Sequence, residues 1–296
     1  MATLRELKGR IGSVGSSEKI TGAMKMISSA KMHKAESIVR RLHPFRECVQ
    51  TIIGSLLSSD AAVSSPLTAA HAQVRRVAVV VLGSDDGLCG AYNANIFKGT
   101  VAVLAELRQQ YGASLDIDIY PVGKKITRTA ERIIKGDAHI HVLQPEGVDS
   151  KSDGDTVKAF AAGLRKQFLD GEVDMVLLQY MNYISSGRQR FGSSTYLPIS
   201  PDELAGNAKV TGRPYLFEPD ADSIFRTVLP MYLLSQMQEA FAQNRASEQA
   251  ARVMAMQAAN DNAKKLLEQL QLEFNKLRQQ SITTELLDIV GGQKRD

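Results

Sequence analysis

The chain has 296 residues, of which 44% are hydrophobic and 23% are charged, a composition typical of a folded protein with a substantial core. No apolar run reaches the about eighteen residues of a membrane-spanning helix, and the amphipathic N-terminus lacks a signal peptide's apolar segment. We therefore expect no membrane span and no removable leader. The net charge is +4, and the two cysteines, Cys48 and Cys89, fall in separate predicted elements, which fits a reducing compartment.

Residues 1–60 are predicted to form one long coiled-coil helix, because their apolar residues recur in steps of three and four with one phase slip between Val14 and Ile20. The stripe consists of Leu4, Leu7, Ile11, Val14, Ile20, Met24, Ile27, Ile38, Leu42, Phe45, Val49, Ile52 and Leu56. Pro44 lies inside this pattern, and we expect it to kink or locally break the helix.

Charge is distributed unevenly along the chain. Residues 1–46 hold ten Lys or Arg against three Glu, whereas residues 221–290 hold seven basic residues against eight acidic ones. The N-terminal helix is therefore predicted to be a cationic rod. Its excess charge indicates either a solvated helix face or a surface that meets an acidic partner.

Residues 58–74 are rich in Ser, Ala and Thr and are predicted to be a linker, and residues 74–217 have the alternating pattern of an α/β domain. Strands are expected at 77–82, 115–122, 139–143, 173–180 and 190–199, and helices at 93–111, 124–135 and 156–169. The first strand is a continuous apolar run, which is typical of a strand buried on both faces. The pattern predicts a Rossmann-like domain with a mainly parallel sheet.

A glycine-containing turn at 83–90 follows the first strand, where dinucleotide-binding folds hold a pyrophosphate. The turn lacks G-x-G-x-x-G and a Walker lysine, and it carries Asp85 and Asp86, so a structural turn is favoured over a nucleotide site. Nothing in the sequence places an activating base beside Cys89, which is interpreted as a packing residue. His139 and His141 share a strand face without a third ligand, so we expect no metal, no cofactor and no catalytic residue.

Residues 220–291 are predicted to form a second coiled-coil helix, because 231–290 contain neither Pro nor Gly and would extend roughly 90 Å as one helix. The later part carries an apolar seam formed by Leu267, Leu270, Phe274 and Leu277. The earlier part carries a seam of mostly small residues: Ala250, Ala251, Met254, Ala255, Ala258 and Ala259. Two long helices with narrow seams favour an antiparallel coiled coil of the two termini over a compact bundle.

Several sequence blocks resemble the gamma subunit of the rotary, proton-translocating ATP synthase of the bacterial type. They are Lys19-Ile-Thr-Gly-Ala-Met-Lys-Met-Ile27, Ala30-Lys-Met32, Ser84-Asp-Asp-Gly-Leu-Cys-Gly90, Ala246-Ser-Glu-Gln-Ala-Ala-Arg-Val-Met-Ala-Met256 and Ser281-Ile-Thr-Thr-Glu-Leu-Leu-Asp-Ile-Val-Gly291. The resemblance covers nearly the whole chain. This sequence departs from the family at Asp86, where a basic residue is common, and at Ala91, where a second glycine is common.

The resemblance implies a non-catalytic central rotor shaft that couples proton-driven rotation of a membrane ring to the nucleotide sites of a surrounding hexamer. The implied partners are the alpha and beta subunits of that hexamer, the epsilon subunit and the membrane ring, at the cytoplasmic face of the bacterial inner membrane. Each orientation of such a shaft biases the conformations of three otherwise identical sites. By motif position, the implied contacts with the hexamer are Met24, Lys25, Arg252, Arg278, Gln279, Thr283 and Glu285, and the family's turn residues are Gly87, Cys89 and Gly90.

Two other functions stay open from the residues alone. An α/β enzyme would bind a nucleotide in a pocket near Gly87 and Gly90. A basic coiled-coil protein would bind nucleic acid along the cationic rod, with an affinity that falls steeply with salt. The rod has few aromatic residues, and the C-terminal helix that is predicted to pair with it is not basic. The sequence therefore offers little support for nucleic-acid binding.

Overall fold

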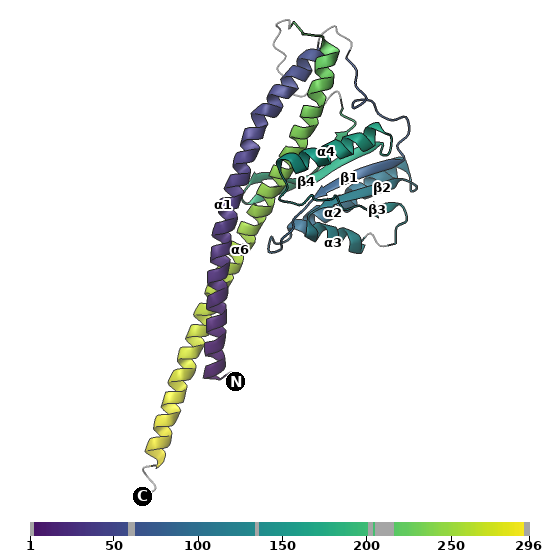
Figure 1. Cartoon of the computed structure of the whole chain (residues 1–296). Coiled ribbons are helices and arrows are strands. Elements are labelled where there is room, and N and C mark those ends of the chain that lie inside the picture. Colours follow the sequence, from purple (N-terminus) through teal and green to yellow (C-terminus); the bar gives the residue numbers. More distant parts are fainter. Residues whose placement is uncertain (1–2, 59–62, 134–135, 201–203, 205–215, 293–296) are drawn as a thin grey trace.

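The computed structural model of this chain describes residues 3–58, 63–133, 136–200, 204 and 216–292. Two long helices form a rod, α1 (Leu4–Leu57) and α6 (Ala221–Gly292), and a sheet domain packs against one side of it (Figure 1). At 72 residues, α6 extends about 110 Å. The predicted combination of a long antiparallel coiled coil and a mainly parallel sheet is confirmed.

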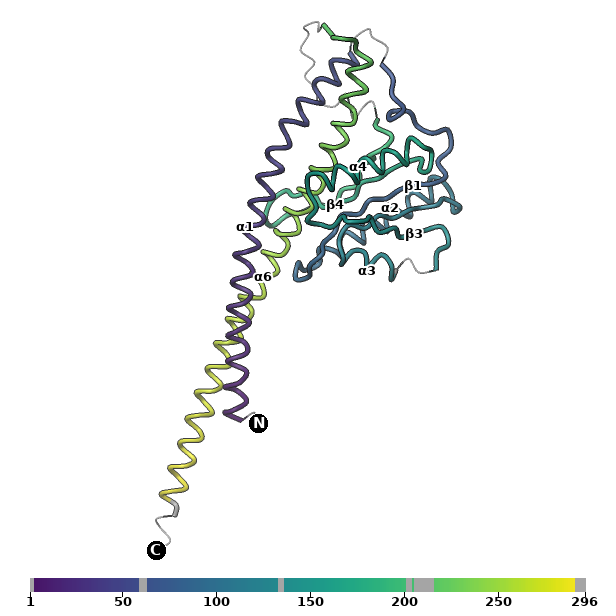
Figure 2. The backbone as a smooth tube through the Cα atoms, in the orientation of Figure 1, coloured from purple at the N-terminus to yellow at the C-terminus, as the bar shows by residue number. Residues whose placement is uncertain are grey.

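Side-chain contacts show that the two helices run antiparallel. Near the start of α1, the backbone carbonyl of Glu18 accepts a hydrogen bond of 2.7 Å from Nδ2 of Asn260. Farther along α1, Nη1 of Arg46 lies 2.6 Å from Oε2 of Glu239. Residues later in α1 thus contact residues earlier in α6, as in an antiparallel pair. Figure 2 shows the two helices side by side.

The N-terminal helix begins with a capping box. The backbone N–H of Glu6 donates to Oγ1 of Thr3, and the backbone N–H of Thr3 donates to the carboxylate of Glu6, which satisfies two donors of the first turn. The helix then continues to Leu57 without interruption. Of the two effects expected at Pro44, the local break is wrong, because the helix extends through this residue, and the kink stays a prediction.

The predicted apolar stripe of α1 needs a correction in its middle and later parts. Ile20, Ile27, Phe45 and Ile52 were expected in the seam, yet each is more than a third exposed. The phase slip after Val14 changes which residues face α6 and the sheet domain. Those buried in the middle of α1 are instead Ser28, Met32 and Ala35.

The seam of α6 is confirmed in its later part and wrong in part of its earlier half. Leu270 is buried, and Leu267, Phe274 and Leu277 are half-buried among mostly exposed neighbours. In the earlier half Met254 and Ala258 are exposed, whereas Ala251 packs on the core of the sheet domain and Ala255 lies against Gly90. Alanine side chains can pack against many kinds of surface. The spacing of these alanines therefore did not show whether they would contact α1 or the sheet domain.

Five strands form the sheet, in the order β3-β2-β1-β4-β5. They are β1 (Arg76–Leu82), β2 (Asp116–Val122), β3 (Ile140–Val142), β4 (Met175–Ser185) and β5 (Arg188–Leu197). The first four are parallel, with Val79 of β1 paired with Ile119 and Leu177, and β5 pairs antiparallel with β4. Connections between parallel strands are made by helices α2 (Tyr92–Tyr111), α3 (Lys124–Ile133) and α4 (Gly154–Leu169).

Both faces of the sheet are covered, which explains the continuous apolar run of β1. On one face Val79 packs in a core with Ile96 of α2 and with side chains of α3. On the other face Val80 shares a core with Phe168 of α4 and Phe225 of α6. The sheet domain is thus built around the start of α6, so the long helix is part of its core as well as of the rod.

Two helix glycines provide a matched test of this packing. A Cβ at Gly99 in α2 would lie 2.5 Å from the ring of Phe191 on β5, whereas a Cβ at Gly163 in α4 would meet no atom within 4 Å. Ala favours a helix over Gly by about 0.5 to 1 kcal/mol, and overpacking costs about 1 to 3 kcal/mol. We expect Gly163→Ala to raise the free energy of unfolding and Gly99→Ala to lower it by about 1 to 2 kcal/mol.

Urea unfolding followed by circular dichroism measures both effects. Equal stabilisation by the two substitutions would contradict the close packing of α2 on β5.

Candidate functional site

The residues singled out from the sequence lie in three places. Four lie close to the C-terminal end of α6: Arg278, Gln279, Thr283 and Glu285. Three lie in the turn after β1: Gly87, Cys89 and Gly90. The other three lie on the rod at the level of the turn: Met24 and Lys25 on α1, and Arg252 on α6.

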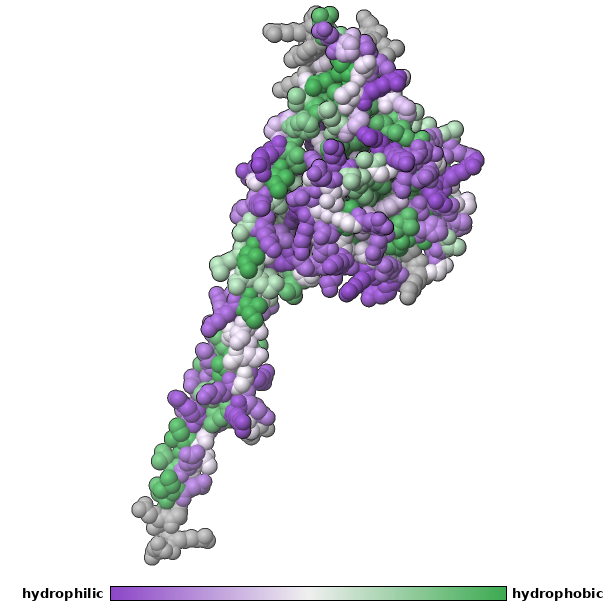
Figure 3. All heavy atoms as spheres, viewed as in Figure 1, coloured by the Kyte–Doolittle hydropathy of each residue, from purple (hydrophilic) through white to green (hydrophobic). Residues whose placement is uncertain are grey.

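The last part of α6, residues 278–290, is here called the tip. It projects beyond the N-terminus of α1, and apolar side chains appear on its surface (Figures 1 and 3). Every tip residue except half-buried Ser281 is exposed. The exposed apolar residues are Ile282, Leu286, Leu287, Ile289 and Val290, each between 49% and 66% exposed. A helix without tertiary packing is weakly stabilised, and clustered apolar residues of this kind mark a surface that another protein covers.

The polar residues of the tip bond locally. The hydroxyl of Thr283 donates to the carbonyl of Gln279 at 2.9 Å, and that of Ser281 lies 3.3 Å from a carboxylate oxygen of Glu285. Among the described residues, Arg278 forms no ion pair with an acidic side chain. Its guanidinium is therefore available to an acceptor on another protein.

The turn after β1, residues 83–91, is held by side chains of its own and by Asn93 of α2. Oδ1 of Asn93 accepts from the backbone N–H of Ser84, and Nδ2 of Asn93 donates to the Ser84 hydroxyl at 2.7 Å. The carboxylate of Asp85 accepts from the backbone N–H of Lys124 and from the hydroxyl of Ser150 at 2.7 Å. Asp85 thus connects the turn to the loops that contain Lys124 and Ser150, at the carboxyl edge of the sheet. A phosphate-binding turn would present hydrogen-bond donors at this edge, whereas this turn presents a carboxylate.

Gly90 lies where the turn meets the long helix. Its φ is +59°, in the left-handed region that favours glycine, and an added Cβ would lie 3.8 Å from Cβ of Ala255. Leu88 also has a positive φ of 64° and is 58% exposed. The predicted structural role of this turn therefore has a clear basis, since it packs directly against α6.

Polar residues of α6 bond to this edge of the sheet, and we call these contacts the junction. Nδ2 of Asn244 donates to the carbonyl of Gly83 at 2.8 Å, and the hydroxyl of Tyr92 donates to Oδ1 of Asn244 at 2.7 Å. The guanidinium of Arg245 donates to the backbone carbonyls of Ser150 and Ser152. Asn244 and Tyr92 are buried, so these bonds form in a region from which water is largely excluded.

An ion pair completes the junction. Nη2 of Arg252 lies 2.5 Å from Oε1 of Glu248, and the two side chains are only 8% and 5% exposed. The same guanidinium donates to the carbonyls of Asp86 and Gly87 in the turn, at 3.4 and 3.3 Å. Burial raises the pKa of Glu248, an effect that the positive charge of Arg252 opposes. Arg252 therefore has an internal role, and its contact with another subunit stays a prediction.

The chemistry of Cys89 follows from its position behind the turn. The side chain is buried, and burial raises the pKa of the thiol. A raised pKa lowers the thiolate fraction at neutral pH, and the thiolate is the nucleophilic form. The geometry therefore favours the packing role predicted for Cys89.

A cavity of about 560 Å³ lies between α1, the turn and α6. It brings together two predicted contact residues, Met24 and Arg252, with the turn residue Gly87, whereas the predicted contact residue Lys25 does not line it. Lys31 and Lys34 of α1 contribute positive charge to its wall. The cationic character predicted for the N-terminal helix is thus present where the helix passes the turn.

Sequence reasoning missed four of the polar residues that fasten the two helices and the sheet domain together. They are Asn244, Arg245 and Asn260 of α6, which bond to the turn, its neighbouring loop and α1, and Tyr92 of α2, whose hydroxyl donates to Asn244. A usable signal was present, because Asn244 and Asn260 interrupt an otherwise small or apolar stripe. Polar residues at such positions indicate buried hydrogen bonds.

Neither a membrane span nor a metal site was identified in the described part of the chain. None of its helices has the length and apolar character needed to cross a bilayer. No three His, Cys, Asp or Glu side chains among the described residues are arranged to hold a metal ion. His139 instead lies 2.9 Å from a carboxylate oxygen of Asp116.

The chain is similar to known proteins over almost its whole length. A family model described as ATP synthase matches residues 3–294. The ATP synthase gamma chain of Phocaeicola vulgatus is 38% identical and that of Chromobacterium violaceum 34% identical, each over 99% of both chains.

Solved structures show the same fold at lower identity. A chain of the Euglena gracilis mitochondrial ATP synthase, in an OSCP/F1/c-ring structure in rotational state 3, aligns with a TM-score of 0.64 and 19% identity, covering 98% of this chain and 93% of that one. A chain of the Tetrahymena thermophila mitochondrial ATP synthase central stalk and c-ring structure aligns with a TM-score of 0.53 and 22% identity, covering 81% of this chain and 99% of that one. With the family model and the gamma chains matched from end to end, the chain belongs to the ATP synthase family and is related to its gamma chains.

Proposed function

We propose that this chain is the central rotor shaft of a bacterial ATP synthase. In this proposal the tip of α6 lies inside the hexamer of alpha and beta subunits, and the sheet domain lies toward the epsilon subunit and the proton-driven membrane ring. The chain itself supplies no catalytic group and stays peripheral, at the cytoplasmic face of the inner membrane. It couples rotation of the ring to the nucleotide sites by presenting different contacts to each site as it turns.

The observation that carries this proposal is the bare tip. In the part of the chain that the structure describes, no partner helix lies beside its five exposed apolar residues, and α1 begins well short of the C-terminal end of α6. A long helix end of this composition is suited to a surrounding protein surface that covers it on all sides. The relatives' name and the central-stalk title of a solved structure support the same assignment.

The cationic rod supports a second contact with the hexamer. Lys31 and Lys34 line the cavity beside the turn, and Ile27 and Leu88 on its wall are 56% and 58% exposed. Exposed apolar residues with surrounding positive charge suit an acidic segment of a catalytic subunit. Met24 and Lys25 lie on the same helix, within this part of the rod.

Two alternatives are tested by simple binding measurements. A nucleotide-binding enzyme would give saturable heat on titration of the chain with ATP or NAD. A nucleic-acid-binding protein would bind duplex DNA with an affinity that falls steeply between low and physiological salt. The carboxylates of Asp85 and Asp86 at the turn oppose the first alternative, because both would repel a phosphate.

A shaft needs a firm connection between its sheet domain and its long helix. The junction allows that connection to be tested. Arg252→Gln would leave the carboxylate of Glu248 buried without its counter-charge. Removing one partner of a buried ion pair costs about 3 to 5 kcal/mol. We expect this variant to lower the free energy of unfolding of the full chain by that amount in a urea titration.

The double variant Arg252→Gln/Glu248→Gln is the matched control, because it removes both charges and leaves neither unpaired. It should recover part of the loss. If the single and double variants are equally stable, the buried pair does not hold the junction.

Arg278 at the tip provides a functional test. Its planar fork of donors can hold a carboxylate or several carbonyls in one orientation of the shaft and release them in the next. A hydrogen bond to a charged group contributes about 1.5 to 3 kcal/mol. If the contact forms mainly at the rate-limiting step, Arg278→Ala slows ATP synthesis and hydrolysis roughly tenfold to a hundredfold in the assembled complex.

The control is Arg278→Lys, which keeps the charge but loses the fork, and we expect an intermediate rate. Assembly is checked by copurification of the hexamer with each variant. Unchanged rates in both directions, in a fully assembled complex, would falsify the role assigned to Arg278.

A further inference from the structure

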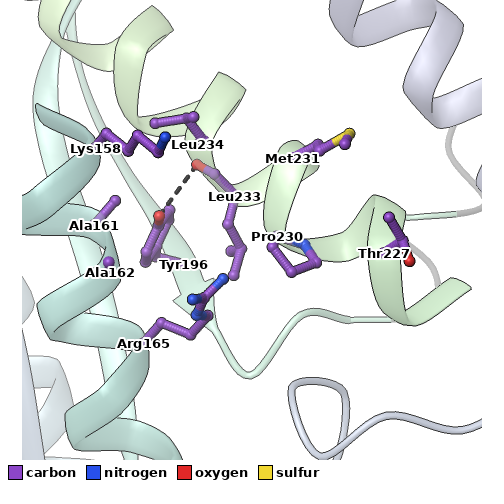
Figure 4. A pocket seen from close by; sticks show the side chains of 10 residues that line it. All are labelled: Lys158, Ala161, Ala162, Arg165, Tyr196, Thr227, Pro230, Met231, Leu233 and Leu234. Atoms are coloured by element: carbon purple, nitrogen blue, oxygen red, sulfur yellow. Dashed lines mark hydrogen bonds between the residues drawn. The ribbon is translucent and has the colours of Figure 1, made fainter. Parts of the chain in front are cut away.

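A second cavity lies away from the turn, between α4, the end of β5 and the start of α6. It has a volume of about 370 Å³ (Figure 4). Its walls are mostly apolar and come from Ala161, Ala162, Pro230, Met231, Leu233 and Leu234. The hydroxyl of Tyr196 does not project an open donor into it, because it already donates to the carbonyl of Leu233 at 3.1 Å.

Two cations of α4 flank this apolar surface. Lys158 and Arg165 are seven residues apart, which places them on one face of the helix about 10 Å from each other along its axis. Figure 4 shows both side chains extending from α4 toward α6, with Ala161 and Ala162 between them. The two alanines leave a space that longer side chains would have filled.

Arg165 differs from the other arginines that are not exposed. Among the described residues these are Arg46, Arg108, Arg165, Arg245 and Arg252. Four of them bond to a carboxylate or to backbone carbonyls within the chain. Arg165 alone has no acceptor among the described residues, although a half-buried guanidinium is stabilised by one.

We propose that this cavity binds an amphipathic aliphatic carboxylate, whose alkyl chain lies along Ala161, Ala162 and Leu233 and whose carboxylate pairs with Arg165. A guanidinium fork matches the two oxygens of a carboxylate, and the apolar surroundings strengthen that pair. Lys158 adds positive potential at the other end. A pocket of this size, apolar with a few convergent polar groups, has the usual character of a small-molecule site.

The site is independent of the rotor contacts proposed above. It joins α4 of the sheet domain to the first turns of α6, around Pro230, so a bound carboxylate would tie the sheet domain to the base of the rod. Because a ligand that binds only the folded chain stabilises it, binding should also raise the unfolding temperature.

The test is calorimetric titration of the full chain with decanoate, kept below the concentration at which it forms micelles. We expect saturable binding of one decanoate per chain and a parallel rise in unfolding temperature. Arg165→Gln should weaken binding at least tenfold, and decanol, which has no charge, should bind at least tenfold more weakly than decanoate. Lys166→Gln is the charge-matched control, since Lys166 follows Arg165 on α4 but does not line the cavity, and should bind as the unchanged chain does.

A second variant tests the location independently of charge. Ala162 is exposed and lines the cavity, so Ala162→Leu fills the space without disturbing the core and should abolish binding. Circular dichroism checks that each variant is folded. Absence of saturable binding to the unchanged chain, or a decanoate affinity in either the Arg165→Gln or the Ala162→Leu variant equal to that of the unchanged chain, would overturn the proposal.

Discussion

Pairing of α1 with α6 buries only a narrow stripe on each helix, and the rest of the molecule depends on this constraint. The outer faces of both helices stay exposed, and no helix among the described residues pairs with the tip of α6. A two-helix rod of this length cannot bury enough apolar surface by itself to cover residues such as Leu287 and Ile289. The rod is therefore suited to a protein that works inside an assembly, with the other subunits completing the burial.

Polar bonds add to the apolar packing of α6 in fastening this rod to the sheet domain. Apolar surfaces can slide past one another at little cost, whereas a buried donor that loses its acceptor costs about 1 to 3 kcal/mol. Asn244, Arg245 and Arg252 each bond to backbone carbonyls whose positions are set by the sheet and its loops. Rotating α6 about its axis would break all of these bonds together. The junction thus resists twisting of α6 relative to the sheet domain. A shaft that carries torque requires such resistance.

The helices and strands of this fold could be predicted from the sequence because the spacing of their apolar and chain-breaking residues is regular. A breaker-free stretch predicts α6, and an apolar run flanked by turn residues predicts β1. Spacing could not show which neighbour a small residue meets, so Ala251 and Ala255 were placed in the coiled-coil seam although they face the sheet domain. Arg252 was likewise singled out by motif position alone. Its buried partner Glu248 lies one turn away, but only the fold shows that both are enclosed by the turn after β1.

The central claim is that this chain turns inside a hexamer, and rotation itself is the most direct measurement. Cys48 is exposed and Cys89 is buried, so a thiol-reactive probe attaches at Cys48 when the other subunits of the complex carry no accessible cysteine. With the hexamer fixed to a surface, the account predicts that ATP drives the probe through continuous rotation in one direction. A probe that keeps its orientation relative to the hexamer while ATP is hydrolysed at the full rate would contradict the account.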